Sequence, residues 1–311
     1  MTFNTKFKSI INNIDNDGDL SQPRDMKVKE LMLAQNDFDP TKTIANFENR
    51  KFNWKYFAGE LAWYLNQNRD VDYIGQFSGF WSTLTNPDSN EINSNYGSLL
   101  FGDQLQWVLD SLKADKNTRQ AIAFLNQPKF QFKGNKDFVC TMYLNFFIRD
   151  NKLNMKVQMR SNDIFYGLTF DAPFFGFVHQ HMRLWLLETY PDLELGTYHH
   201  CADNIHFYER HFELAAKIKS ESLNSGEDYE FNLEKPFFKL EDNNMVLTNF
   251  GTRYVEDVDQ LVSEVSKQIE YKKLLTKYIN ISKTNKYAGA TENISWSKKI
   301  NSGGFRQSVD V

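Results

Sequence analysis

The sequence predicts an α+β fold, in which helices pack against a sheet that contains a β-hairpin. Apolar residues recur at helical spacing over 54–66 and 104–114, and they crowd residues 173–190. Residues 152–160 instead alternate between apolar and polar side chains, which is typical of a strand with one buried face. The chain has 311 residues, 41% of them hydrophobic, so it can bury a substantial core, and we expect one domain rather than two.

Two segments have the pattern of packed helices. Phe57 and Leu61 lie at near-helical spacing within 54–66, which reads WKYFAGELAWYLN. The same pattern recurs over 104–114, QLQWVLDSLKA, and stops at the turn signal that begins with Asp115. Both segments are therefore predicted to be helices.

A third helix is predicted from Pro173 to Tyr190, because a helix tolerates the missing N–H of proline in its first turn. We place Asp171 just before this helix. Residues 255–275 show another amphipathic pattern. Residues 282–311 are rich in Asn, Ser, Gly and Lys, and we expect them to be partly mobile.

A hairpin is predicted where the strand 152–160 follows another apolar run. Asp150 and Asn151 form a plausible tight turn between the two segments. Cys140 and Arg160 are at similar distances from this turn, so the hairpin would bring them close together.

Composition limits the kinds of partner. A formal net charge of −4 gives no overall attraction for nucleic acid or anionic membranes, so arginines must bind any phosphate locally. No stretch approaches the roughly 18 apolar residues that cross a bilayer. Residues 1–20 lack the apolar region and cleavage site of a signal peptide. We expect a cytoplasmic protein that does not bind membranes.

Cysteine usage does not indicate a disulfide scaffold, because only Cys140 and Cys201 occur. Cys201 lies beside His199, His200 and Asp203, which suggests a metal cluster as an alternative. The chain has no CxxC or HExxH pattern, and we expect no metal.

Cys140 is the candidate nucleophile. A thiol with a pKa of about 8.5 is only slightly ionised at neutral pH, so it needs nearby cations. Arg160 would supply one if the hairpin forms. The alternative is that Cys140, in FVCTMYL, is a small buried hydrophobic residue.

The motifs around Cys140 occur in a distinctive order. Residues 137–171 read DFVCTMYLNFFIRDNKLNMKVQMRSNDIFYGLTFD, and residues 199–211 read HHCADNIHFYERH. They resemble the thymidylate synthase signature, which runs from a catalytic cysteine through a hairpin to Arg-Ser-x-Asp, Gly-Leu-x-Phe-Asn and His-x-Tyr. GELAWYL, FW, NSNYG and NTRQAIAF extend the likeness over about residues 22–215. The resemblance implies a thymidylate synthase-like fold in one catalytic domain over 1–311: a large mixed β-sheet packed with helices, dimerising through the sheet, with residues 216–311 as a C-terminal extension.

The resemblance also implies catalytic roles. Cys140 resembles the thiolate that adds to C6 of a pyrimidine nucleotide, so that C5 can attack a one-carbon unit from 5,10-methylenetetrahydrofolate. Glu60, in GELAWYL, resembles the glutamate that organises water and proton transfers, although without the resemblance it reads as an exposed helix charge. Tyr96 resembles a tyrosine near the thiol.

Four residues resemble the family's phosphate ligands. Arg160 and Ser161 resemble the pair that binds the nucleotide phosphate, a task that suits guanidinium groups. Arg24 resembles an N-terminal arginine that closes over it. Arg119 resembles an arginine donated across a dimer interface, which implies a homodimer with shared sites. The family usually has a second arginine where this chain has Gln120.

Further residues resemble sugar and folate ligands. His206 and Tyr208, two apart on a predicted strand, would point to the same side and hold the sugar hydroxyl. Without the resemblance, this pair would be equally consistent with packing. Trp81 and Asp163 resemble residues of the folate pocket, where the ring offers an apolar face and the carboxylate accepts from pterin N–H groups.

Asp171 departs from the usual family pattern, because GLTFD here replaces GLPFN. An asparagine amide matches the N3–H donor and O4 acceptor of uracil, whereas a protonated carboxyl group matches the reversed edge of cytosine. Phage deoxycytidylate hydroxymethylases, a subgroup of the family, have aspartate at this position. Their Cys-Thr and Asn-Ser-Asn-Tyr-Gly motifs resemble Cys140-Thr141 and residues 93–97. The resemblance implies that the substrate is deoxycytidylate (dCMP).

The product is predicted less directly. Hydroxymethylation is favoured by the subgroup resemblance, by Glu60 as a group that could position water, and by Leu84 and the terminal SVDV, which replace residues usual in thymidylate synthases. Alternatives are a dCMP C5-methyltransferase, a thymidylate synthase acting on deoxyuridylate (dUMP), and a noncatalytic nucleotide- or RNA-binding relative. The joint presence of Glu60, Cys140, Arg160 and Asp163 argues against a noncatalytic relative.

Overall fold

The computed structural model describes residues 1–86, 89–222, 229–248, 251 and the backbone of 269–270. The segment 282–311, and all of 255–275 except that backbone, therefore lie outside the described residues.

Helices and strands are interspersed along the chain. The helices are α1 (Phe3–Asp17), η1 (Pro23–Asp25), α2 (Trp54–Asn66), α3 (Val71–Gly75), η2 (Trp81–Thr83), α4 (Tyr96–Leu100), α5 (Asp103–Ala114), η3 (Pro128–Phe130), η4 (Ile164–Leu168), α6 (Thr169–Leu186), η5 (Glu209–His211) and α7 (Phe212–Ser220). The strands are β1 (Asp19–Ser21), β2 (Val28–Phe38), β3 (Ile122–Phe124), β4 (Thr141–Arg149), β5 (Lys152–Met159), β6 (Asn162–Asp163), β7 (Glu194–Tyr208), β8 (Glu230–Phe231), β9 (Phe238–Glu241), β10 (Asn244–Leu247) and β11 (Ile269–Glu270).

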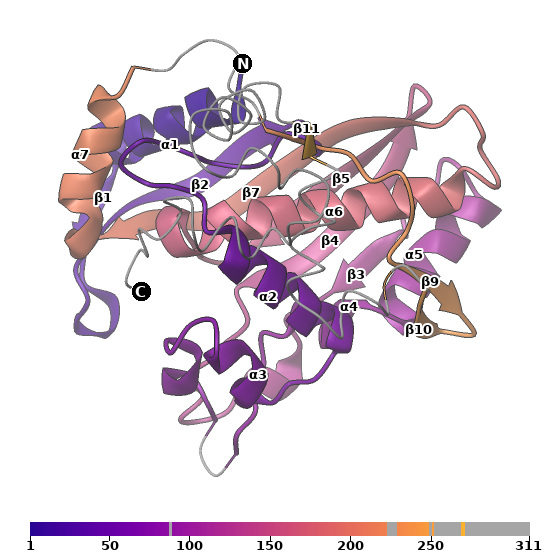
Figure 1. The fold of residues 1–311 in the computed structure, drawn as a ribbon, viewed down its shortest axis with the longest axis horizontal. Helices are drawn as coiled ribbons and strands as arrows, with labels where there is room; N and C mark the ends of the chain where they lie inside the picture. The colour runs from indigo at the N-terminus through magenta and orange to yellow at the C-terminus, as the bar shows by residue number, and fades with distance from the viewer. Residues whose placement is uncertain (87–88, 223–228, 249–250, 252–268, 271–311) are drawn as a thin grey trace, which may run out of the picture.

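A seven-stranded mixed sheet forms the centre of the molecule (Figure 1). Its order is β1-β2-β7-β5-β4-β3, and the short strand β6 also pairs with β7. Both β5 and β6 run parallel to β7, whereas the other pairs are antiparallel. The large mixed sheet predicted from the sequence is confirmed.

The predicted hairpin is present as β4 and β5. Arg149 pairs with Lys152, and the two turn residues, Asp150 and Asn151, have φ values of 50° and 57°. Asp and Asn tolerate this left-handed conformation, and a turn with two such residues matches the twist of the strands. The hairpin therefore places the segments before β4 and after β5 side by side.

Helix α6 begins earlier than predicted. It starts at Thr169 and ends at Leu186, so Asp171 lies in its first turn and Pro173 lies inside it. The reason is that η4 leads directly into α6, and η4 is capped by the side chain of Asp163. The prediction that Asp171 precedes the helix is wrong.

The helices predicted over 54–66 and 104–114 are confirmed as α2 and α5. Alternate residues of β5, from Leu153 to Met159, are buried, and α6 contacts β5 and β7. Figure 1 shows α6 lying across the sheet. On the other face of β5, Asn154, Lys156 and Gln158 are half-buried and Lys152 is exposed. No described helix is long and apolar enough to cross a bilayer.

Candidate active site

Cys140 and Arg160 meet at the open end of the hairpin. The backbone N–H of Arg160 donates to the carbonyl of Cys140 at 2.9 Å, and Nη2 of Arg160 lies 3.4 Å from Sγ of Cys140. The guanidinium also donates to the carbonyl of Phe138 and lies over its ring, 4.8 Å from the centroid. These contacts hold the cation against the thiol, as the sequence predicted.

The electrostatic balance at Cys140 differs from the prediction. Burial raises the pKa of the thiol, while the charges of Arg160 and Arg24 lower it and those of Asp171 and Asp137 raise it. The net shift is upward, because desolvation is the largest contribution. The two arginines therefore oppose the burial effect without overcoming it.

Asp171 is a half-buried carboxyl group whose charge acts on the thiol of Cys140. Burial raises its pKa to about 7, although a hydrogen bond from Asn162 to Oδ2, at 2.8 Å, lowers it. Burial also raises the pKa values of Glu60 and Tyr96, and Asp171 raises each of them further. Cys140, Glu60, Tyr96 and Asp171 thus form one electrostatically coupled group.

Glu60 is buried, so its interpretation as an exposed helix charge is wrong. Burial raises its pKa to about 8. The hydroxyl of Tyr56 donates to Oε1 of Glu60 at 2.8 Å and accepts from Nε1 of Trp81 at 3.0 Å. Sequence reasoning missed Tyr56, although its position four residues before Glu60 on one helix puts the two side chains on the same face.

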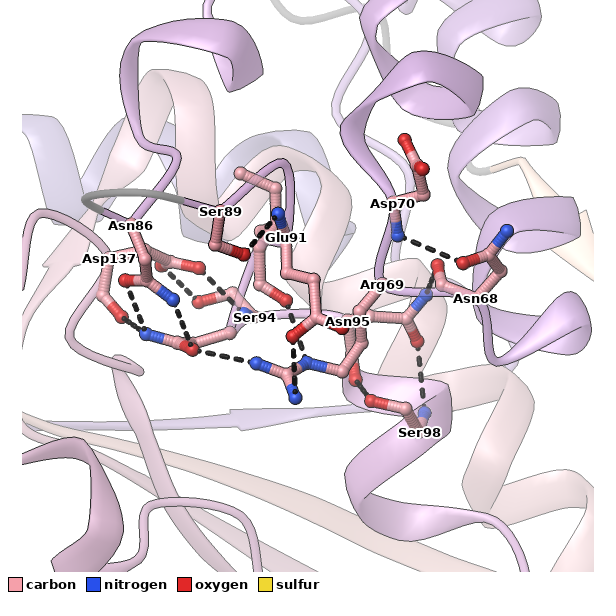
Figure 2. A network of polar contacts seen from close by, with 12 residues as sticks. Asn68, Arg69, Asp70, Asn86, Ser89, Glu91, Ser94, Asn95, Ser98 and Asp137 are labelled. Atoms are coloured by element: carbon pink, nitrogen blue, oxygen red, sulfur yellow. Dashed lines mark hydrogen bonds and ion pairs between the residues drawn. The ribbon is translucent and has the colours of Figure 1, made fainter.

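A polar network fixes the loop that precedes Cys140 (Figure 2). The carboxylate of Asp137 accepts from the backbone N–H of Ser94 at 2.7 Å and from its hydroxyl. Asn93 donates to the carbonyl of Asp137 at 2.9 Å. Because Tyr96 lies two residues beyond Ser94, the network holds Tyr96 and Cys140 in one arrangement. Sequence reasoning had included Asn93 and Ser94 only in the NSNYG motif and had missed Asp137.

Three of the four predicted phosphate ligands lie near Cys140 or act on it, and the fourth does not. Ser161 is half-buried and follows Arg160. Arg24 is exposed in η1 with a φ of 51°, and its charge reaches Cys140. Arg119 is exposed between α5 and β3, and no contact within the described part of the chain joins it to the site.

His206 and Tyr208 lie on the same side of β7, as predicted, with ring centroids 5.3 Å apart. His206 is buried, and its Nδ1 lies 2.9 Å from Oδ1 of Asn204. Strand β6 pairs Asp163 with His206 in the parallel register. The candidate sugar and folate ligands are therefore neighbours.

The environment of Asp163 fits a ligand with N–H donors. Its Oδ1 accepts from the backbone N–H groups of Phe165 and Tyr166, at 2.7 and 2.6 Å. Its Oδ2 is buried and has no hydrogen-bond partner among the described residues. Burial raises the pKa of this carboxyl to about 6. A pterin could donate to Oδ2, and the half-buried ring of Trp81 could lie against it.

The residues around Cys201 do not converge. His199 lies on the half-buried face of the sheet, with Nδ1 2.7 Å from Oδ1 of Asp37, whereas His200 points into the core. Adjacent strand residues face opposite sides, so the two imidazoles cannot hold one metal ion. Within the described ranges, no three potential ligands are grouped.

The fold and site define an α+β protein built around a partly buried thiol, an arginine, the buried carboxyl of Glu60 and the half-buried carboxyl of Asp171. A family model described as thymidylate synthase matches residues 5–255. The chain belongs to the thymidylate synthase family, which confirms the resemblance seen in the sequence.

Two phage proteins are among its relatives. The chain is 29% identical over 220 residues to the deoxyuridylate hydroxymethyltransferase of Bacillus phage SP01, a match that covers 65% of this chain but only 56% of that protein. It is 31% identical over 173 residues to the deoxycytidylate 5-hydroxymethyltransferase of Enterobacteria phage T4, covering 52% of this chain and 70% of that protein.

A solved structure confirms the fold. The thermostable thymidylate synthase A from Bacillus subtilis superimposes with a TM-score of 0.60 at 21% sequence identity. The match covers 81% of this chain and 96% of the other. The predicted thymidylate synthase-like fold is therefore confirmed.

Proposed function

We propose that the protein hydroxymethylates dCMP at C5, using 5,10-methylenetetrahydrofolate and water and releasing 5-hydroxymethyl-dCMP and tetrahydrofolate. The observation that most favours this function is the half-buried carboxyl of Asp171, whose pKa desolvation raises to about 7 and whose charge acts on Cys140. A carboxyl group with this pKa is partly protonated at neutral pH, so one oxygen can donate while the other accepts.

This pattern suits the edge of cytosine. The protonated oxygen of Asp171 donates to N3, and the other oxygen accepts from the exocyclic amino group. The donation to N3 also withdraws electrons from the ring and favours attack at C6. Uracil presents the opposite pattern and would need the proton on the other oxygen.

Cys140 then acts as the nucleophile. Its thiolate forms a bond to C6, and the displaced electron pair lets C5 form a bond to the one-carbon unit. Loss of the C5 proton breaks the bond from that carbon to tetrahydrofolate and leaves a methylene group on C5. Water adds to this methylene, the C5–C6 double bond re-forms, and the C6–S bond breaks to release the thiolate. The folate, when bound, supplies a one-carbon unit at the oxidation level of formaldehyde. Arg160 stabilises the thiolate at 3.4 Å. Glu60, whose pKa burial raises to about 8, can hold a proton near the attacking water.

The remaining ligands are assigned to the nucleotide and the folate. Arg24, Arg160 and Ser161 bind the phosphate, and His206 with Tyr208 holds the sugar. We assign Trp81 and Asp163 to the folate, which the unpartnered Oδ2 of Asp163 supports.

We include a homodimer in the proposal. On one face, α6 contacts β5 and α5 contacts β4, whereas Phe147 and Lys156 on the other face are half-buried in the described chain. Such a face suits a second copy of the sheet. Arg119 makes no contact with its own site among the described residues, which fits donation to the partner's phosphate. We also propose that the protein acts in the cytoplasm, in the synthesis of phage nucleotides.

Hydroxymethylation of dUMP is the second candidate, because the SP01 relative is a deoxyuridylate hydroxymethyltransferase. Incubation with dCMP or dUMP plus methylenetetrahydrofolate separates the candidates. Consumption of dCMP with no dihydrofolate absorbance supports the proposal. Consumption of dUMP alone would contradict the assignment of Asp171, and dihydrofolate formation would indicate a methyl product.

A further inference from the structure

Three buried polar side chains form a hydrogen-bonded row that begins at Asp171. Asn162 donates through Nδ2 to Oδ2 of Asp171 at 2.8 Å. Oδ1 of Asn162 lies 3.0 Å from Nε2 of His200, and Nδ1 of His200 lies 2.7 Å from the hydroxyl of Tyr198. Asn162 is 3% exposed, and His200 and Tyr198 are fully buried. The sequence indicated no role for Asn162 or Tyr198, and it placed His200 only in the alternative metal cluster.

The direction of the hydrogen bonds follows from Tyr198. Within the described residues, His200 is the only hydrogen-bond partner of the Tyr198 hydroxyl. If Nδ1 of His200 were the donor, the hydroxyl proton of Tyr198 would be buried without an acceptor, which is costly. Tyr198 therefore donates to Nδ1. Burial lowers the pKa of His200 to about 3, so the ring is neutral and its one proton lies on Nε2.

This tautomer orients the amide of Asn162. A protonated Nε2 needs an acceptor, and only the carbonyl oxygen of Asn162 can be one, so its NH₂ group must face Asp171. An N–H donor directed at Oδ2 stabilises that oxygen as an acceptor and leaves Oδ1 as the oxygen that binds a proton. The Tyr198 hydroxyl therefore determines the tautomer of His200. That tautomer determines the orientation of the amide that donates to Asp171.

We propose that Asn162, oriented by His200 and Tyr198, is a positioning residue that fixes the proton of Asp171 on Oδ1 and so determines which base the site accepts. The inference rests on the proposed function, since it assigns Oδ1 to N3 of cytosine and Oδ2 to the amino group. Oδ2 can accept from both Asn162 and that amino group. Uracil would require a proton on Oδ2, where it would compete with the N–H of Asn162.

Gly167 provides the space that this arrangement requires. A Cβ atom at Gly167 would lie 2.6 Å from Nδ2 of Asn162 and 3.1 Å from Oδ2 of Asp171. Both atoms belong to the one hydrogen bond on which the proposal depends. Any side chain at position 167 would displace the amide or the carboxyl.

Two variants and one control test the proposal. Asn162→Leu removes the N–H donor to Asp171 while keeping a side chain of similar volume. His200→Phe removes the group that orients the amide of Asn162, so this amide can flip. His179→Phe is the control, because His179 is also fully buried but hydrogen-bonds to the carbonyl of Leu153 at 2.8 Å. Dissociation constants for dCMP and dUMP are measured by calorimetry, and kcat/KM is measured for each nucleotide.

We expect both variants to lower the preference for dCMP over dUMP by at least about tenfold, whereas the control keeps the wild-type ratio. If Asn162 and His200 had only a structural role, the variants would weaken the binding of dCMP and dUMP equally. The ratio of kcat/KM for dCMP to that for dUMP would then be unchanged. An unchanged ratio in either variant, with a cooperative thermal transition showing that it is folded, would overturn the inference. A wild-type preference for dUMP would instead contradict the proposed function, while a shifted ratio would still establish Asn162 as a positioning residue.

Discussion

Nη2 of Arg160 lies 3.4 Å from Sγ of Cys140, at the point where the two strands of the hairpin open. The arginine is held there by the carbonyl of Phe138, so its charge is directed at the thiol even without a nucleotide. Arg160, which we assign to the substrate phosphate, therefore also lowers the pKa of the Cys140 thiol.

This proximity predicts that Arg160→Gln makes the thiol harder to ionise. Burial already raises the pKa of Cys140, and the variant removes the largest opposing charge, so the pKa rises further. The rate of iodoacetamide alkylation, followed against pH in a Cys201→Ser background, should shift to higher pH. Arg149→Gln, at the exposed far end of the hairpin, is the matched control. An unshifted alkylation profile in Arg160→Gln would show that the contact has no electrostatic effect.

The hairpin was predictable from the sequence because its signals are local. Alternation over 152–160 and the Asp150-Asn151 pair fix both strands and the turn, and with them the meeting of Cys140 and Arg160. The start of α6 was not predictable, because the capping side chain of Asp163 acts through η4 and overrides the proline signal.

The hydrogen-bond partners of the site residues also could not be predicted from the sequence. Asn162 reaches His200 across 38 positions of the chain, a contact that depends on the parallel pairing of β6 with β7. The sign of the Cys140 pKa shift depends on burial, which motifs do not report. The family motifs were enough to predict the candidate site residues, whereas the residues that orient them could be identified only from the fold.

Asp171→Asn should move substrate preference from dCMP toward dUMP by at least about a hundredfold, because an amide matches the N3–H and O4 of uracil. The measurement is kcat/KM for each nucleotide at one folate concentration. Asp203→Asn, an exposed carboxylate on β7, controls for loss of charge. If Asp171→Asn still prefers dCMP, a residue other than Asp171 must discriminate between cytosine and uracil.

Tyr56→Phe should shift the pH dependence of turnover. The hydroxyl of Tyr56 donates to Glu60 and lowers the pKa of its carboxyl, so removing the hydroxyl raises that pKa. The limb of the kcat profile that reports Glu60 should move to higher pH, and kcat at neutral pH should change by about tenfold. Tyr73→Phe, whose hydroxyl has no partner in the described chain, should leave the profile in place. Equal profiles for Tyr56→Phe and wild type would exclude a role for this contact.

Stability should fall as pH rises from about 4.5 to about 8. Burial raises the pKa of Glu60 from 4.5 to about 8, so across this interval the folded state binds more protons than the unfolded state. Glu60→Gln should remove a slope of up to ~1.4 kcal/mol per pH unit from the free energy of unfolding, measured by urea titration. Below about pH 4.5 both states are protonated and this contribution is constant. A slope that is the same in Glu60→Gln and wild type would contradict a buried, protonated Glu60.

The most direct measurement is the mass of the nucleotide formed from dCMP and methylenetetrahydrofolate in ¹⁸O-labelled water. We expect 5-hydroxymethyl-dCMP that contains the heavy oxygen, and no product from Cys140→Ser, which should still bind dCMP. A 5-methyl product, an unlabelled hydroxymethyl group, or conversion of dUMP alone would contradict the proposed function.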